Sequence, residues 1–319
     1  MKAWAYSPCG ISSFFEVPSN LSKDPRAIGS RGGGFCISKG VTAEVSIEPI
    51  SGETSVVETF INGHQVDFYV ARKAVLKVLD MVDGAYKVVV RQRIEAPIGC
   101  GFGTSAASAL ATALATSKAL GLRLSLWKLA EIAHVVEVEC CTGLGTVSGL
   151  ITGGVVVVKK PGAPREGYTL RIPVDNTFKV VAAAFQPIEK RKILLSRSQL
   201  QWINSLGRRA LQMVLAKPTL DTFLKAAKFF SENSGLASCK VRTAITLAER
   251  KGALAAFQNM IGEAIHAIVP LHRVDEVAQA LEELSPPRIV VSDLHFEGSK
   301  ARLAEHLALV RKSNKIGGA

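Results

Sequence analysis

The sequence predicts an α+β fold in two domains, and three observations support this prediction. The chain has 319 residues and is 48% hydrophobic, which suits one large or two moderate domains with real cores. The first half mixes strand-like and helix-like segments, whereas helices dominate the second half. Proline and glycine content peaks at 161–164, and strand-like alternation restarts afterwards. We therefore expect an N-terminal domain of residues 1–164 and a helix-rich C-terminal domain of residues 165–319.

Strands in the first half are indicated by alternation and by turn residues. Val41–Ile47 alternates with the period of a half-buried strand. Asn62-Gly63 is a strong hairpin signal after a short apolar run. Pro8-Cys9-Gly10 is expected to separate two strands, and Gly29–Gly34 is expected to form a glycine-dense turn. The expected strands of this half are 2–7, 11–17, 41–47, 56–61, 86–94 and 155–158.

Helices in the first half follow from spacing and from end signals. Residues 66–81 place apolar side chains largely along one side of a helix. An alanine-rich helix is expected over 106–120, ended by Gly121. Ser125 is typical of an N-cap for a further helix running to about residue 140, and a turn is expected at 142–146.

The second half is expected to begin with two strands and to continue mainly as helices. The expected strands are 168–172, 179–185, 263–269 and 288–291. The expected helices are 198–215, 220–231, 239–250, 254–261 and 275–284, followed by a basic helix in the tail from residue 299.

The stretch Pro97–Ser108 organises the chain, because three alternating glycines lead directly into the alanine-rich helix. Glycines let the backbone approach a ligand closely and adopt dihedral angles that other residues avoid. The N–H groups at a helix N-terminus form an anion site that the helix dipole favours. Thr104 or Ser105 could cap the helix, and a hydroxyl there could reach a phosphate-bound metal ion. The expected ligand is a polyphosphate.

Two common phosphate-binding motifs do not fit this stretch. A P-loop requires lysine after the last glycine, and no lysine follows Gly103. The dinucleotide fingerprint spaces its glycines as GxGxxG, whereas this chain has GxGxG. The alternative reading is a strand-to-helix turn without a ligand, although such a turn needs one glycine rather than three.

Candidate metal and substrate ligands lie near this loop in the predicted structure. His134 and Glu137 are three residues apart on one helix and so share a face. Glu137 and the Ser105 hydroxyl could hold Mg²⁺ together with phosphate oxygens and water; the alternative for Glu137 is an exposed helix carboxylate. His134 could bind a substrate carboxylate or hydroxyl, or be satisfied within the core. Ser30 and Arg31 could bind a carboxylate, or form a structural turn.

Charge, cysteines and hydropathy narrow the class of protein. The formal net charge of +12 favours anionic partners, but the basic residues are dispersed and few aromatics lie among them. We therefore expect no nucleic-acid partner. No cysteine pair has CxxC spacing, and Cys140-Cys141 is a poor disulfide. No secretory segment and no membrane-length apolar run is evident, so a cytoplasmic location is expected.

Several motifs together resemble the archaeal pantoate kinases, a family of the GHMP kinases. The loop resembles the second GHMP motif, which wraps ATP phosphates. The resemblance covers about the first half of the chain and is weaker in the second, where a third motif is expected at Met260–Glu263. The matching stretches are Ala5–Glu16, Gly29–Gly34, Pro97–Ala107, His134–Glu137, Gly143–Gly145 and Gly153–Gly162.

This resemblance implies a two-domain GHMP kinase fold, with an N-terminal half like domain 2 of ribosomal protein S5. It implies transfer of phosphate from ATP to the 4-hydroxyl of (R)-pantoate, in coenzyme A biosynthesis. Glu137 and Ser105 would hold Mg²⁺, and Ser30, Arg31 and His134 would lie beside pantoate. The residues that would bind ATP are Pro97, Gly99, Gly101, Gly103, Thr104, Ser105 and Ala106.

Two positions depart from the family pattern. Thr146 stands where many members have an aspartate, the presumed base or metal-site carboxylate, and Val158 stands where an arginine often occurs. Threonine cannot act as a base at neutral pH, yet positioning and charge neutralisation supply most of the acceleration of phosphoryl transfer. Two alternatives stay open: a related kinase for a homoserine- or mevalonate-like acceptor, and a non-catalytic nucleotide sensor. A homodimer is compatible with the family.

Overall fold

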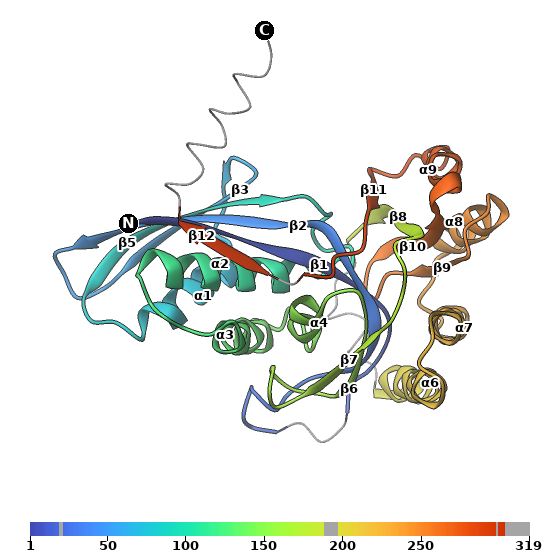
Figure 1. Ribbon diagram of the computed structural model, residues 1–319, viewed down its shortest axis with the longest axis horizontal. Coiled ribbons are helices and arrows are strands. Elements are labelled where there is room, and N and C mark those ends of the chain that lie inside the picture. The colour runs from blue at the N-terminus through green and yellow to red at the C-terminus, as the bar shows by residue number, and fades with distance from the viewer. Residues whose placement is uncertain (19–21, 188–196, 298, 304–319) are drawn as a thin grey trace, which may run out of the picture.

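The fold is built on two β-sheets, seen in the computed structural model, which describes residues 1–18, 22–187, 197–297 and 299–303 (Figure 1). The larger sheet has the strand order β12-β1-β2-β5-β3-β4, and it is extended by β6, which pairs with β2, and by β7, which pairs with β6. Its strands are β1 (Lys2–Glu16), β2 (Arg31–Ile50), β3 (Val56–Ile61), β4 (His64–Gln65), β5 (Ala85–Ile94), β6 (Val155–Lys160), β7 (Tyr168–Ile172) and β12 (Lys300–Leu303).

Strand β1 runs unbroken through the point where the sequence predicted two strands, so that prediction was wrong. It pairs antiparallel with β2 along almost its whole length, with register shifts between Ser7 and Cys9 and between Ser12 and Phe14. Pro8 lacks an N–H and would interrupt a regular ladder, and an irregularity at this point accommodates it.

The predicted glycine turn at 29–34 was also wrong, because Arg31–Gly34 open strand β2. Here β2 is paired on both sides, with β1 and with β6. A Cβ on Gly34 would overlap the carbonyl oxygen of Ile11, and one on Gly32 the carbonyl of Phe14. These glycines therefore serve close packing of neighbouring backbones rather than a turn.

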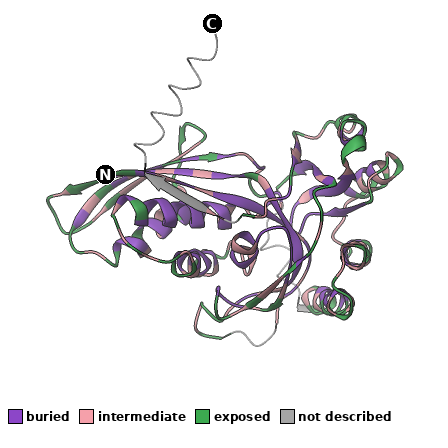
Figure 2. Cartoon of the chain, in the orientation of Figure 1, coloured by how far each residue is buried: buried purple, intermediate pink, exposed green. Residues whose placement is uncertain are grey.

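Helices α1 (Tyr69–Leu79), α2 (Thr104–Ala119), α3 (Leu126–Glu139) and α4 (Thr146–Thr152) lie together against one side of the larger sheet (Figure 1). α2 is buried along nearly its whole length, because its alanines let it pack closely on β1 and β2 (Figure 2). Two of its buried polar residues bond to β5: the Ser108 hydroxyl donates to Gln92 Oε1 over 2.8 Å, and the Gln92 amide donates to the Thr112 hydroxyl over 2.7 Å. Ser125 caps α3 as predicted. The turn expected at 142–146 is present up to Gly145, and α4, which begins at Thr146, was not predicted.

The smaller sheet is antiparallel, with the order β11-β8-β10-β9. Its strands are β8 (Phe178–Gln186), β9 (Ala255–Gln258), β10 (Glu263–Pro270) and β11 (Arg288–Ser292). Helices α8 (Cys239–Arg250) and α9 (Val274–Glu282) pack on it, with the 3-10 turn η1 (Leu271–Arg273) between β10 and α9. Helices α6 (Arg197–Ala216) and α7 (Leu220–Asn233) pack on each other and on β1.

The helix predicted over 254–261 was wrong, since residues Ala255–Gln258 form strand β9 and pair with β10. A short, fully buried apolar run does not distinguish helix from strand by periodicity. The basic helix predicted from residue 299 was likewise wrong for its first residues, because Lys300–Leu303 form strand β12 and pair with β1. The rest of that prediction lies outside the described residues.

The predicted domain boundary at residue 164 stays a prediction. Strands β7 and β12 both follow that residue, yet they belong to the larger sheet. Helices α6 and α7 of the second half also pack on β1. Segments of the second half thus complete the larger sheet and pack on it, with β1 contacting β12, α6 and α7.

We expect Gly207→Ala to destabilise the protein, because Gly207 is the point where α6 meets β1. A Cβ at this position would overlap the carbonyl oxygen of Phe15. Alanine gains up to about 1 kcal/mol in helix propensity, but overpacking against backbone typically costs about 1–3 kcal/mol. Urea unfolding should show a net loss of stability, while Gln201→Ala on the exposed face of α6 stays within about 0.5 kcal/mol. Equal stability of both variants would contradict this packing.

Candidate active site

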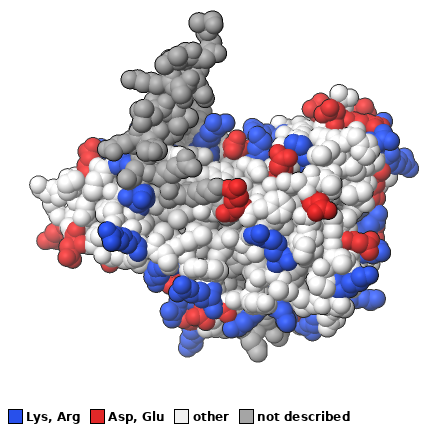
Figure 3. All heavy atoms as spheres, in the orientation of Figure 1, with Lys and Arg blue, Asp and Glu red and all other residues white. Residues whose placement is uncertain are grey.

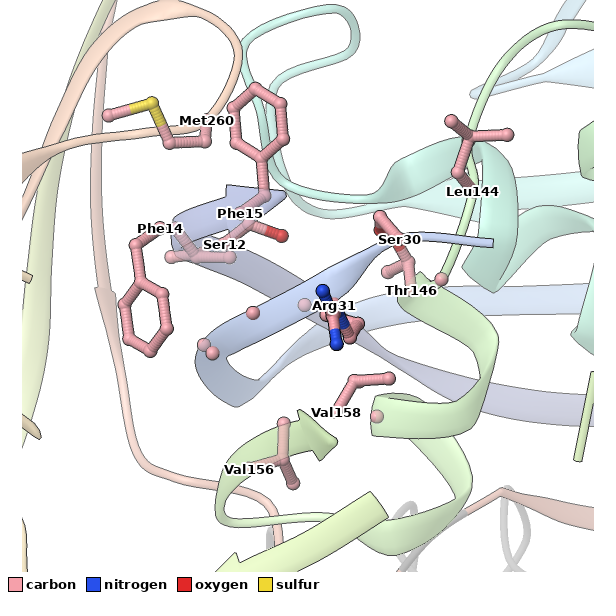
Figure 4. A pocket seen from close by; sticks show the side chains of 18 of the residues that line it. Ser12, Phe14, Phe15, Ser30, Arg31, Leu144, Thr146, Val156, Val158 and Met260 are labelled. Atoms are coloured by element: carbon pink, nitrogen blue, oxygen red, sulfur yellow. The ribbon is translucent and has the colours of Figure 1, made fainter. Parts of the chain in front are cut away.

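A cavity of about 340 Å³ lies where β1, β2, β6 and the α3–α4 connection meet (Figure 4). Its walls are mostly apolar, with Phe14, Phe15, Leu144, Val156 and Val158 among them. Polar groups come mainly from Ser12, Ser30, Arg31, Thr142 and Thr146. A largely apolar cavity with a few convergent polar groups is typical of a site for a small ligand.

The glycine loop adjoins this cavity where Gly103 lies close to Gly10 and Thr146. Gly103 adopts φ 60°, and a Cβ there would lie 2.6 Å from Thr146 Cγ2 and 2.8 Å from the carbonyl oxygen of Gly10. The Gly10 N–H donates to the Phe102 carbonyl over 3.1 Å. Gly10 and Thr146 also line the cavity. The residue before α2 is therefore in contact with two residues that line the cavity, so the start of α2 lies close to the cavity.

Helix α2 begins with Gly103 as its N-cap, so the predicted capping by Thr104 or Ser105 was wrong. Thr104 and Ser105 lie inside the first turn, and Gly103 has no side chain to cap the helix. The first N–H groups of a helix lack partners within the helix. Such groups favour an anion, so the predicted phosphate role of this loop stays a prediction.

The second half of the chain supports the loop from the other side. A Cβ on Gly101 would lie 2.8 Å from Asn259 Cβ, and one on Gly99 2.8 Å from Pro187 Cβ. Gly262 packs directly on the backbone of Cys100. The third motif that the sequence placed at 260–263 therefore lies against the loop.

A buried polar chain fixes this contact. The Asn259 amide donates to the Cys100 carbonyl over 3.1 Å, and Asn259 Oδ1 lies 2.9 Å from His266 Nδ1. His266 Nε2 lies 2.8 Å from the Ser13 hydroxyl. Because Asn259 Oδ1 can only accept, Nδ1 carries the proton and Ser13 donates to Nε2. Burial lowers the pKa of His266 from 6.5 to about 3, so the ring stays neutral.

Glu137 is buried at 3% exposure, near the end of α3. The Thr142 hydroxyl donates to its Oε1 over 2.6 Å, and a Cβ on Gly143 would overlap its Oε2. The carboxylate is thus directed toward the loop that lines the cavity, and glycine at 143 leaves room for it. The competing carboxylate, Glu139, instead pairs with Lys73 and Lys77 at 2.8 and 3.0 Å.

The connection between α3 and α4 links Glu137 to the start of α2. Gly143 lies against the Glu137 carboxylate, and Thr146 lies against Gly103, which directly precedes the first turn of α2 with Thr104 and Ser105. The described residues contain no group of three His, Cys, Asp or Glu suited to a metal. One carboxylate and one hydroxyl, completed by phosphate and water, is a donor set that Mg²⁺ accepts.

The three predicted substrate ligands are placed differently. Ser30 and Arg31 line the cavity, a position that is compatible with the predicted contact with a substrate (Figure 4). His134 is buried and is not among the residues that line it; its Nε2–H donates to the Ile28 carbonyl over 2.8 Å. Burial lowers the pKa of His134 below its usual value, against the opposing effect of the Ile28 and Pro25 carbonyls. His134 thereby holds the segment that ends in Ser30.

Sequence reasoning missed Thr142, and it placed Met260 and Ile261 in a third motif without assigning them to the cavity wall. Thr142 orients Glu137, and Met260 and Ile261 close the cavity from the second half. Thr142 carried one available signal, since it directly precedes the Gly143–Gly145 stretch. Met260 is brought to the cavity by long-range packing against β1, where its N–H donates to the Ser12 carbonyl over 2.9 Å. No local pattern encodes that contact.

A second cavity, of about 460 Å³, adjoins the strand end that leads into the loop. Ile94 and Glu95, which shortly precede Pro97, line it together with Lys39, Arg93 and Arg288. The three cations surround a single carboxylate, so the cavity carries a positive excess. Anions are favoured there.

The fold and the loop together define a kinase of the GHMP class. The family model of the GHMP kinases N terminal domain matches residues 69–154, which include the glycine loop, α2 and α3. A solved structure described as a phosphotransferase related to the CoA biosynthesis pathway has a TM-score of 0.86 and 27% identity, with 95% of this chain and 99% of that chain covered.

Sequence relatives narrow the family further. Pantoate kinase of Thermococcus kodakarensis is 31% identical over 291 residues, 89% of this chain and 93% of that protein. Pantoate kinase of Methanospirillum hungatei is 32% identical over 274 residues, 83% of this chain and 86% of that protein. The chain therefore belongs to the pantoate kinase family of the GHMP kinases, and the resemblance seen in the sequence is confirmed.

We expect acid to destabilise this protein partly through His266. The folded chain holds the ring neutral with a pKa of about 3, whereas the unfolded chain takes up a proton near 6.5. The free energy of unfolding should therefore fall as pH drops below 6.5, by roughly 1 kcal/mol per pH unit. His134 acts in the same direction, so the test compares the wild type with His266→Gln between pH 7 and 5. Parallel stability curves for the two proteins would contradict the assignment.

Proposed function

We propose that the protein transfers phosphate from ATP to the 4-hydroxyl of (R)-pantoate, as the names of its relatives indicate for those proteins. One observation carries this proposal: a small-ligand cavity, in which Arg31 is the single charged residue among the described lining residues, meets a glycine loop at a helix start. Gly10, Gly103 and Thr146 form the meeting point. An acceptor in the cavity and a polyphosphate on the loop would thus lie next to each other.

The chemistry of pantoate suits the cavity. Pantoate combines a carboxylate at one end with two methyl groups and two hydroxyls. The apolar walls fit the methyl groups, and the guanidinium of Arg31 fits the carboxylate. Ser30 supplies a hydroxyl, and its own N–H is fixed by donation to the Leu144 carbonyl over 2.8 Å. We assign His134 the role of holding this segment in place through Ile28.

The nucleotide would lie on the loop between Pro97 and Ala106, with its phosphates on the amides at the start of α2. The positive cavity beside Glu95 supports approach from that side. Ser105 and Glu137 would hold Mg²⁺, which neutralises charge on the transferred phosphate. Thr142 keeps the Glu137 carboxylate directed by its hydrogen bond.

Thr146 shapes the site and does not serve as its base. Its methyl group packs against Gly10 and Gly103, and its hydroxyl would stay protonated at neutral pH. Because phosphoryl transfer has a loose transition state, positioning by the loop and by Arg31 supplies most of the acceleration. The proton of the acceptor hydroxyl then passes to phosphate or to water.

We further propose a cytoplasmic location and small-molecule partners. All six cysteines are free thiols, which suits a reducing cytoplasm. The described part of the chain holds no helix that is both long and apolar enough to span a bilayer. On the face shown in Figure 3, basic side chains are dispersed among acidic ones, which gives no support to a nucleic-acid partner. We propose that the protein forms a homodimer, and sedimentation analysis would test this.

The direct test measures ADP release with Mg-ATP and pantoate as the single acceptor. We expect turnover that depends on pantoate, and a loss of roughly 10²-fold or more in kcat for Glu137→Gln, because one transition-state contact is removed. Glu139→Gln is the matched control and should stay within about threefold, since Glu139 pairs with Lys73 and Lys77 and does not line the cavity. Turnover with homoserine or mevalonate but not pantoate would reject the acceptor. Tight ATP binding without turnover would instead favour a nucleotide sensor.

Substitutions at position 146 distinguish a role of Thr146 in packing from a role in proton transfer. Thr146→Val keeps the packing on Gly10 and Gly103 and should leave kcat within about threefold. Thr146→Asp introduces a carboxylate beside the acceptor, and a working general base would raise kcat by up to about 10²-fold. Steady-state kinetics with pantoate at pH 7 check both variants. Abolished turnover in Thr146→Val would show that the hydroxyl itself takes part in the reaction.

A further inference from the structure

A buried carboxylate behind the cavity is shared by two arginines from different halves of the chain. Glu16, at the end of β1, is 1% exposed. Its Oε2 pairs with Arg31 Nη2 at 2.6 Å. Its Oε1 accepts from both Nε and Nη2 of Arg208 on α6, each at 3.1 Å. The three side chains form a cluster with two positive charges and one negative charge.

This cluster decides the charge that the cavity presents to a ligand. Arg31 carries the only charged side chain among the described residues that line the cavity, and Arg208 is not one of them. Arg31 Nε is buried and has no hydrogen-bond partner among the described residues. With Glu16 alone, the charge of Arg31 would be balanced. With Arg208 on the other oxygen, the cluster keeps a net charge of +1, and the Arg31 side chain, which is 31% exposed, can present that charge to a ligand.

The position of Arg208 is fixed by how α6 docks on β1. The Asn204 side chain accepts from the Val17 N–H over 2.8 Å and donates to the Val17 carbonyl over 2.7 Å. One turn away, Gly207 lets the helix pack directly on the Phe15 carbonyl. These contacts place Arg208 over Glu16. The Arg208 side chain nevertheless remains 61% exposed to solvent.

We propose that Arg208 is a positioning residue outside the cavity that sets the selectivity for acceptors carrying a carboxylate. It does so by sharing Glu16 with Arg31, so that the Arg31 guanidinium is left to bind an anion. This inference rests on the proposed function for the identity of the acceptor, but the charge argument holds for any small carboxylate. An exposed arginine acts through a screened interaction, so the effect is moderate and depends on salt.

The test compares Arg208→Gln with two matched variants, Arg208→Lys and Arg209→Gln. Arg209 is the next residue of α6 and lies over the Phe229 ring, away from Glu16. Calorimetry measures the Kd of pantoate and of pantoamide, which has the same skeleton without the charge. We expect Arg208→Gln to weaken pantoate binding about three- to tenfold and to leave pantoamide unchanged. Arg208→Lys should retain part of the affinity, and Arg209→Gln all of it.

Kinetic measurements separate this role from a structural one. In Arg208→Gln, KM for pantoate should rise while KM for ATP and kcat stay within about twofold. The difference from wild type should shrink as salt is raised. Equal weakening of pantoate and pantoamide, or a joint loss of kcat and both KM values, would overturn the inference.

The outcomes also distinguish the two proposals. If wild type converts pantoate but Arg208→Gln does not discriminate acid from amide, the inference fails and the function stands. If wild type neither binds nor converts pantoate, the function fails. The charge argument is then tested by measuring the affinity of wild type and Arg208→Gln for a panel of small hydroxy acids. Equal affinities of the two proteins would reject it.

Discussion

The close approach of Gly10, Gly103 and Thr146 is the constraint on which the site depends. It brings the end of the glycine loop, strand β1 and the start of α4 within van der Waals distance of one another. A side chain at Gly103 would overlap the Gly10 carbonyl and the Thr146 methyl group, and one at Gly10 would crowd Leu150 and Thr146 on α4. Because the site exists only where these backbones touch, the two glycines matter for their missing side chains, and Thr146 matters first for its shape.

Strand β1 transmits this arrangement to the rest of the molecule. It pairs with β2 and β12, carries α6 and α7 on its second half, and ends in Glu16. The smaller sheet reaches the loop through Asn259, His266 and Ser13, and the last of these is again on β1. One strand therefore supports the phosphate loop, the cavity wall and the charge cluster at the same time.

Local signals predicted what local chemistry controls. Glycine spacing and an alanine-rich run predicted the loop and α2, and Asn62-Gly63 predicted the hairpin between β3 and β4, where both residues have positive φ. Of the three residues expected beside the substrate, Ser30 and Arg31 line one cavity together with Thr146, whereas His134 does not. Packing decided the rest: Arg31–Gly34 became strand because two strands flank it, Ala255–Gln258 because β10 pairs with it, and Arg208 joined Glu16 only through the docking of α6.

A structure with a non-hydrolysable ATP analogue, Mg²⁺ and pantoate bound together tests the central claim most directly. The account predicts phosphates on the amides between Gly99 and Ser105, and the pantoate carboxylate within hydrogen-bond distance of Arg31. The 4-hydroxyl would point past Gly103 toward the terminal phosphate. Pantoate bound outside the cavity, or a nucleotide whose phosphates leave the start of α2 unoccupied, would contradict it.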